Sequence, residues 1–251
     1  MLAKRIIPCL DVKEGRVVKG VNFVGLTVSG NAIDLAEKYS NEGADELIFL
    51  DIAATNDKRK TVFDLVKEVS KKISIPFTIG GGIRSIEDMK RALVSGADKV
   101  AINSAAYLNK DLISQSANIF GSQCVVLAVD VKSNNGKWEV YINGGRIKIN
   151  KYASEWIREA VEKGVGEILL TSIDRDGTKA GFDTELIRIF SDMVSVPIIA
   201  SGGAGTVTDF VDVFENGNAD GALAASIFHD GTISIKEVKK YLKMKNITVR
   251  I

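Results

Sequence analysis

The sequence is poor in the residues that build metal centres or cross-link small secreted domains. Its 251 residues include two cysteines, three prolines and a single histidine. Four clustered His or Cys ligands are missing, which argues against a structural zinc site. Cys9 and Cys124 stand alone in apolar runs, and we expect both to be reduced and buried. His229 is expected to be a structural residue rather than a catalytic base.

The chain also lacks an excess of either charge and any long apolar run. Its 33 basic and 32 acidic residues leave a net charge of +1. This balance gives no basis for binding nucleic acid or an anionic membrane. Apolar runs such as 125–129 are too short to cross a bilayer, and no secretory signal precedes the first predicted strand. We therefore expect a cytoplasmic protein.

Short β-branched runs alternate with amphipathic helical segments along the whole chain. Strands are predicted at residues 5–10, 46–50, 77–79, 99–102, 125–129, 168–171, 198–200 and 222–224. Helices are predicted at residues 32–39, 62–71, 86–94, 112–120, 154–163, 184–192, 207–215 and 235–243. Eight strand–helix units in one chain of this length predict a single (β/α)8 TIM barrel, with an open doubly wound sheet as the alternative.

The two halves of the sequence resemble each other. Residues 76–84 correspond to 197–205, residues 10–13 to 129–132, residues 43–50 to 164–171, and residues 96–104 more loosely to 218–226. No Pro- or Ser-rich linker divides the chain. The repeat therefore predicts two fused half-barrels in one domain, roughly 1–122 and 123–251.

Two connections are longer than a barrel needs. Residues 12–31, after the first predicted strand, are expected to form a loop that is a candidate lid over the catalytic face. After the fifth strand, Asn135-Gly136 is a strong two-residue hairpin signal between alternating residues that end at Gly144-Gly145. We expect a small β-hairpin over the same face.

Asp11 and Asp130 end the first and fifth predicted strands, at equivalent positions of the two halves. In a barrel these strand ends face each other across the catalytic mouth. Two carboxylates placed there can divide the roles of general acid and general base. Each aspartate could instead be a helix cap or a turn residue, but the repeat favours catalysis.

Glycine-rich turns follow the third and seventh predicted strands, and small polar residues follow the fourth and eighth. Glycine lets backbone N–H groups converge on an anion, although a turn alone can also require it. Two such sites predict a substrate with a phosphate at each end. The candidate substrate- and phosphate-binding residues are Lys19, Asp51, Gly82, Asn103, Ser104, Thr171, Asp176, Gly177, Ser201, Gly203, Ala225 and Ser226.

Charged residues stand at the start of the first, second, fourth and sixth predicted strands, Glu167 immediately before its strand, and we call this set the floor ring: Arg5, Glu46, Lys99 and Glu167. Strand alternation places them on the inward side, with Arg5 in phase with Asp11 and Lys99 in phase with Asn103. Barrel interiors are normally apolar, and buried charge pairs often add little stability. The sequence leaves two interpretations, a gate or conduit and a floor network without a function.

These motifs together resemble one enzyme family over nearly the whole chain. Residues 5–13, 17–23, 171–178 and 200–205 are similar to the cyclase subunit of imidazole glycerol phosphate synthase, from histidine biosynthesis. The resemblance implies a lyase that takes ammonia and a bisphosphate, phosphoribulosyl-formimino aminoimidazole carboxamide ribotide. It implies imidazole glycerol phosphate and aminoimidazole carboxamide ribotide as products, and it implies no cofactor or metal.

The resemblance also implies roles for individual residues. Asp11 and Asp130 match the family's acid/base pair, and Lys19 matches a residue of its mobile loop. The floor ring matches a gate for ammonia from a glutaminase subunit docked on the N-terminal face of the barrel. The alternatives are the preceding isomerase of the pathway, also a two-fold barrel with two aspartates, and a non-catalytic or engineered phosphate-binding barrel.

Overall fold

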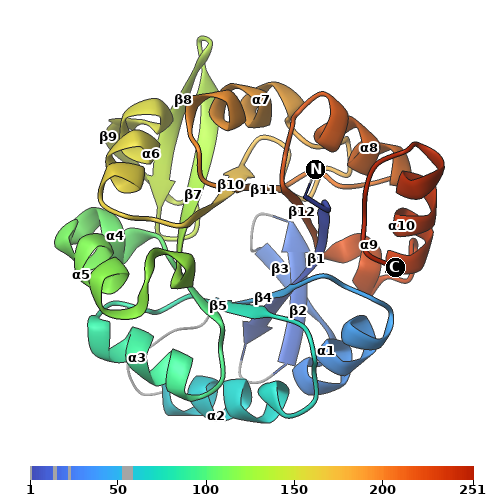
Figure 1. The fold of residues 1–251 in the computed structure, drawn as a ribbon, viewed down its shortest axis with the longest axis horizontal. Coiled ribbons are helices and arrows are strands. Elements are labelled where there is room, and N and C mark those ends of the chain that lie inside the picture. The colour runs from blue at the N-terminus through green and yellow to red at the C-terminus, as the bar shows by residue number, and fades with distance from the viewer. Residues whose placement is uncertain (1, 14–15, 22–23, 53–58) are drawn as a thin grey trace.

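Parallel strands close into a barrel inside a ring of helices (Figure 1). The computed structural model describes residues 2–13, 16–21, 24–52 and 59–251. The barrel strands are β1 (Arg5–Lys13), β4 (Leu47–Asp51), β5 (Phe77–Gly80), β6 (Lys99–Ile102), β7 (Val125–Asn134), β10 (Glu167–Ser172), β11 (Ile198–Ser201) and β12 (Gly221–Ala224). β12 pairs with β1 and β7 pairs with β10, so the eight strands close into a barrel. The predicted TIM barrel is confirmed, and the alternative prediction of an open doubly wound sheet is wrong.

The helices lie outside the barrel and agree with the predicted ones to within three residues at either end. They are α1 (Ala32–Asn41), α2 (Arg59–Ser70), α3 (Ile86–Val94), α5 (Asp111–Phe120), α6 (Ala153–Glu162), α7 (Thr184–Met193), α8 (Val207–Glu215) and α10 (Ile235–Met244). Short helices α4 (Ser104–Leu108) and α9 (Ser226–His229) and a 3-10 turn, η2 (Ser122–Cys124), complete the connections. Side chains of Asn31, Ser85, Asp183 and Ser234 cap α1, α3, α7 and α10, so these helix starts are encoded locally.

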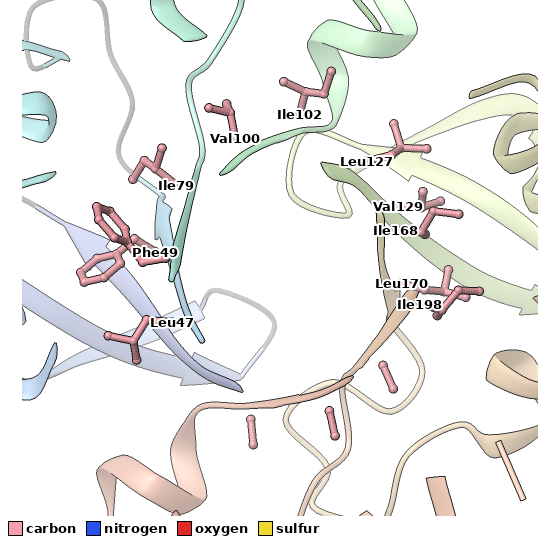
Figure 2. Close-up of a cluster of buried hydrophobic side chains, with 14 of the residues drawn as sticks. Leu47, Phe49, Ile79, Val100, Ile102, Leu127, Val129, Ile168, Leu170 and Ile198 are labelled. Atoms are coloured by element: carbon pink, nitrogen blue, oxygen red, sulfur yellow. The ribbon is translucent and has the colours of Figure 1, made fainter. Parts of the chain in front are cut away.

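Strand alternation divides the core into two apolar layers. Outward residues such as Leu47, Phe49 and Ile198 pack between the sheet and the helices (Figure 2). The inward layer, which we call the interior cluster, consists of Ile7, Cys9, Ile48, Ala101, Val126, Leu169, Ile199 and Leu223. Of the described barrel strands, β5 alone contributes no residue to this cluster, because its inward position holds the fully buried Thr78.

Aspartates fasten the N-terminal edges of several strands to their neighbours. Each accepts a hydrogen bond from a backbone N–H at the start of an adjacent strand: Asp45 from Ile6 (2.9 Å), Asp98 from Phe77 (2.9 Å) and Asp220 from Ile198 (3.0 Å). Gly166 holds the equivalent position before β10. A Cβ there would lie 2.1 Å from the carbonyl oxygen of Ser122, so the close approach of η2 requires glycine.

The connection after β1 differs from the predicted loop. β1 continues to Lys13 and pairs antiparallel with β2 (Arg16–Val21), which pairs with β3 (Val24–Asn31). The prediction of a loop at 12–31 was therefore wrong. β-branched residues such as Val17 and Val18 extend the sheet, and pairing with β1 supplies hydrogen bonds that a loop would lack.

The predicted hairpin after the fifth barrel strand is confirmed. β7 pairs antiparallel with β8 (Lys137–Ile142), and β8 pairs with β9 (Ile147–Tyr152). Asn135 and Gly136 form the turn with φ of 51° and 75°, the left-handed conformation expected of this dipeptide. Both halves of the barrel thus carry an antiparallel extension on the strand that holds the candidate aspartate.

The two cysteines occupy different environments. Both are free, and Cys9 is buried in the interior cluster as expected. Cys124 is only half-buried, so that part of the expectation was wrong. It ends the 3-10 turn η2 instead of lying within the strand that follows. None of the helices in the described residues is long and apolar enough to cross a membrane.

Candidate active site

Asp11 and Asp130 lie at the carboxyl-terminal mouth of the barrel. Their strands, β1 and β7, stand on opposite sides of the barrel (Figure 1). Asp11 follows Ile7 and Cys9 on the inward side of β1, and Asp130 follows Val126 on the inward side of β7. Both residues are half-buried at the mouth.

The surroundings raise the pKa of both carboxyls. Burial raises the pKa of Asp11 to about 7, the negative charge of Asp176 adds to the rise, and the thiol of Cys9 opposes it. Burial also raises the pKa of Asp130 to about 6, opposed by a hydrogen bond from Asn103 and assisted by Asp176. Near neutral pH, Asp11 therefore holds a proton much of the time while Asp130 is mostly ionised.

Different neighbours hold the two carboxylates. The Asn103 amide Nδ2 donates a 3.0 Å hydrogen bond to Asp130. The thiol of Cys9 lies 3.6 Å from an oxygen of Asp11. Sequence reasoning assigned Asn103 to a phosphate site and gave Cys9 no part. The inward parity of both residues was the available signal, but parity alone does not specify a contact.

Two more candidates lie on the next two strands of the barrel after that of Asp130. Thr171 of β10 is in register with Asp130, and Ser201 of β11 is in register with Thr171. All three have the inward parity of the interior cluster. One side of the mouth thus presents a carboxylate and two hydroxyls in a row.

The first candidate phosphate site lies at the ends of β5 and β6. Gly81 and Gly82 have φ of 84° and 69°. A Cβ on Gly81 would lie 2.1 Å from the carbonyl oxygen of Asp51, so the turn itself requires that glycine. The Ser104 hydroxyl accepts a 2.9 Å hydrogen bond from the N–H of Asn143, in the turn between β8 and β9. That bond leaves the hydroxyl proton of Ser104 available for an anion.

The second candidate site lies at the ends of β10, β11 and β12. Gly177 and Gly203 have φ of 74° and 102°. The turn that carries Asp176 packs on the adjacent Gly202, where a Cβ would lie 3.4 Å from the Asp176 nitrogen. Burial raises the pKa of Asp176, and the N–H of Gly177 opposes that rise.

Backbone geometry supports the equivalence of the two halves at these sites. Asn103, just before Ser104, has φ −125° and ψ −94°. Ala225, just before Ser226, has φ −120° and ψ −76°. Both residues therefore leave their strands in the same unusual conformation. The two short helices that follow begin at repeat-equivalent serines.

Two residues of interest, Asp51 and His229, lie apart from these groups. Asp51 has the parity of Leu47 and Phe49, which face the helices, and it lines a small apolar cavity of the outer layer. Its role in substrate binding stays a prediction. The Lys19 side chain is outside the described part of the structure, and its role stays a prediction too. His229 shares a 2.7 Å hydrogen bond with the Tyr39 hydroxyl, which suits a structural residue.

The floor ring forms at the opposite end of the barrel. Arg5 contacts Glu46 at 2.9 Å and Glu167 at 2.5 Å. Lys99 contacts the same two carboxylates at 2.9 Å and 2.7 Å. Each cation thus bridges both anions, and the four charges close a neutral ring beneath the interior cluster. In the described residues, no group of three or more His, Cys, Asp or Glu is placed to hold a metal ion.

Known proteins align with this sequence over its whole length. The family described as "Histidine biosynthesis protein" matches residues 5–234. Imidazole glycerol phosphate synthase subunit HisF of Clostridium beijerinckii is 57% identical over 253 residues. The proteins of the same name from Streptococcus sanguinis and Geobacillus thermodenitrificans are 56% and 55% identical over 252 residues. Each alignment covers 100% of both chains, and the names favour the cyclase over the isomerase alternative. The chain therefore belongs to the histidine biosynthesis family and, within it, to the HisF-type cyclase subunits of imidazole glycerol phosphate synthase, which are lyases.

Proposed function

We propose that the cyclase reaction takes place between Asp11 and Asp130. The substrates are phosphoribulosyl-formimino aminoimidazole carboxamide ribotide and ammonia, and the products are imidazole glycerol phosphate and aminoimidazole carboxamide ribotide. One observation carries the proposal. Two repeat-equivalent carboxyls stand on opposite strands of the mouth, with pKa values of about 7 and about 6. A pair that shares about one proton near neutral pH suits a reaction made of proton transfers.

The different neighbours of the two aspartates suggest how they begin the reaction. Ionised Asp130, held by Asn103, accepts a proton from the nitrogen as ammonia adds to the substrate carbonyl. Protonated Asp11 donates to the carbonyl oxygen, which gives a carbinolamine and exchanges the states of the two carboxyls. Asp130 then returns its proton to that oxygen, which leaves as water, while Asp11 accepts a second proton from the nitrogen to leave an imine. The pair is restored by these two transfers, so it can serve the later cleavage of the formimino C–N bond and the ring closure. Their titrations therefore belong to the pair.

The two glycine-rich sites are proposed to hold the phosphate at each end of the substrate. Ser104 with Gly82 serves one end, and Ser226 with Gly177 and Gly203 serves the other. Fixing both ends would place the reacting carbon between the aspartates, and such positioning can be worth many powers of ten in rate. The hydroxyl of Ser104, already oriented by Asn143, supports this role.

The floor ring is proposed to admit ammonia from a glutaminase subunit docked on the N-terminal face of the barrel. The interior cluster between the ring and the aspartates is apolar, which suits neutral ammonia and disfavours ammonium. The relatives are named as subunits, which supports a partner. Mixing the chain with its cognate glutaminase should give a complex at micromolar concentration. If no complex forms and ammonia alone supports full turnover in cells, the passage is excluded.

The decisive assay supplies the purified chain with the ribotide substrate and excess ammonium salt at raised pH. Loss of substrate absorbance should follow without any partner. Asp11→Asn and Asp130→Asn should each abolish turnover while leaving substrate binding largely intact. Asp192→Asn, at an exposed residue of α7 paired with Arg188, is the matched control and should behave as wild type. A parent chain with no turnover would overturn the proposal.

A further inference from the structure

We infer that the floor ring is hinged: Glu46 is its fixed side, and the ring opens by release of Glu167. This inference rests on the proposed ammonia passage. Thr78 and Asp45 are then positioning residues, because they hold the fixed side and touch no reacting atom.

The two carboxylates of the ring are held unequally. Glu46 accepts from Arg5 (2.9 Å), from Lys99 at both oxygens (3.0 and 2.9 Å) and from the hydroxyl of Thr78 (2.8 Å). In the described residues, Glu167 has one contact with Arg5 (2.5 Å) and one with Lys99 (2.7 Å). Four contacts hold one carboxylate and two hold the other.

The extra contact of Glu46 comes from a difference between the two halves of the chain. Thr78 is in register with Ile48, two residues beyond Glu46. The equivalent residue of the second half, Ile199, is in register with Leu169, two residues beyond Glu167. The geometry is therefore the same on both sides, but Ile199 has no hydroxyl to donate.

The backbone ahead of each glutamate shows the same difference. Asp45, just before Glu46, accepts from the Ile6 N–H at 2.9 Å and from Lys239 at 2.8 Å. Gly166, just before Glu167, keeps only the equivalent backbone bond, 3.1 Å to the carbonyl of Val125. Side-chain hydrogen bonds and an ion pair thus fix the backbone at Glu46, and among the described residues no such side-chain contact fixes it at Glu167.

Opening at Glu167 leaves one fewer buried polar group without a partner than opening at Glu46 would, while either route keeps Arg5 and Lys99 paired with the remaining glutamate. If Glu167 swings away, Lys99 and Arg5 both remain paired with Glu46. If Glu46 moved instead, the hydroxyl of the fully buried Thr78 would lose its acceptor as well. An uncompensated buried group is strongly destabilising, so the first route is favoured.

Exchanging the residues at the two equivalent positions tests the hinge. The measurement is the ratio of glutamine-dependent to ammonium-dependent turnover, in the complex with the cognate glutaminase. Ile199→Thr should supply Glu167 with the missing donor and lower the ratio roughly tenfold relative to Ile199→Val, the effect of one hydrogen bond to a charged group. Ile199→Val controls for lost packing. Equal ratios for these two variants, both shown to be folded by thermal unfolding, would overturn the hinge.

The fixed side supplies a second, independent test. Thr78→Val should make the Glu46 side chain more mobile and weaken closure of the ring. Some ammonia would then be lost before it reacts, so that more glutamine is hydrolysed per product formed. Thr78→Ser keeps the hydroxyl and should restore wild-type coupling. If Thr78→Val couples as tightly as wild type, Glu46 does not need its anchor and the hinge is wrong. This pair remains informative if Ile199→Thr does not fold.

Lys99→Met separates failure of the hinge from failure of the passage. Lys99 bridges both carboxylates, so its loss must change the turnover ratio if ammonia passes the ring at all. A changed ratio for Lys99→Met with unchanged Thr78 and Ile199 variants rejects the hinge alone. An unchanged ratio for every variant rejects the passage itself.

Discussion

The amide of Asn103 donates a 3.0 Å hydrogen bond to Asp130, whereas Ala225, the repeat equivalent of Asn103, offers Asp11 no such donor. The two halves of the barrel therefore place the same acid in different surroundings. An amide donor favours the ionised form of Asp130, whereas within the described part of the chain the side-chain donor to Asp11 is the weak thiol of Cys9. The divergence of one repeated position thus opposes the rise that burial causes in the pKa of Asp130, and it has no counterpart at Asp11.

Removing that donor should shift the pH dependence of turnover. Asn103→Ala is expected to raise the pKa of Asp130, so the acidic limb of the rate profile moves to higher pH. Turnover at pH 6 should fall roughly tenfold more than turnover at pH 8.5, the effect of one hydrogen bond to a charged group. Ser104→Ala is the control and should raise KM without moving the limb. A profile that falls equally at every pH would instead assign Asn103 to substrate binding alone.

Asp11→Asn should stabilise the fold while abolishing activity. A carboxyl whose pKa is higher in the folded chain destabilises it as pH rises from the unfolded value, 3.8, to the folded one, about 7. The difference corresponds to at most about 4 kcal/mol above pH 7 and to nothing below pH 4. Denaturant unfolding of variant and parent at pH 4 and pH 8.5 measures it. A variant that gains no stability at pH 8.5 would show that burial of the ionised Asp11 carboxylate does not destabilise the folded protein.

Two glycines with similar backbone angles should respond differently to alanine. Gly81 and Gly136 have φ of 84° and 75°, but only at Gly81 would a Cβ meet backbone, 2.1 Å from the Asp51 carbonyl oxygen. Gly136→Ala should cost about 1 kcal/mol, from the left-handed backbone alone. Gly81→Ala should cost more than about 3 kcal/mol or prevent folding, because neighbouring backbone must move. Urea unfolding of both variants tests this, and equal losses would contradict it.

Lys239 should prove important for stability although it lies on the last helix. Its amine contacts buried Asp45 at 2.8 Å, so α10 is tied to the start of β4. Lys239→Met leaves that carboxylate buried without its cation, which should cost about 3 kcal/mol or more of unfolding free energy. Lys240→Met, at the exposed next residue, should change it by less than about 0.5 kcal/mol. Similar losses of unfolding free energy in the two variants would show that the buried Lys239–Asp45 pair stabilises the fold no more than the exposed side chain of Lys240 does.

The hydrophobic periodicity of the sequence and its internal repeat determined much of the fold and of the candidate site. The alternation of β-branched runs with amphipathic segments specified the barrel, since each strand and helix must bury one face. The correspondence of the halves placed Asp11 and Asp130 on opposite strands, and strand parity placed the floor ring inside the barrel. These features follow from local period and order along the chain, so the sequence alone sufficed to predict them.

Tertiary structure decided what depends on contacts between distant segments. Only pairing with β1 turned residues 16–21 and 24–31 into strands instead of a loop. Only the pairing of β6 with β7 brought Asn103 to Asp130, and only the pairing of β4 with β5 brought Thr78 to Glu46. Parity gives the direction of a side chain, but the partner it meets depends on strand stagger and on barrel closure. For that reason the residues at both ends of the barrel could be predicted from the sequence, but which of them contact one another was determined by the fold.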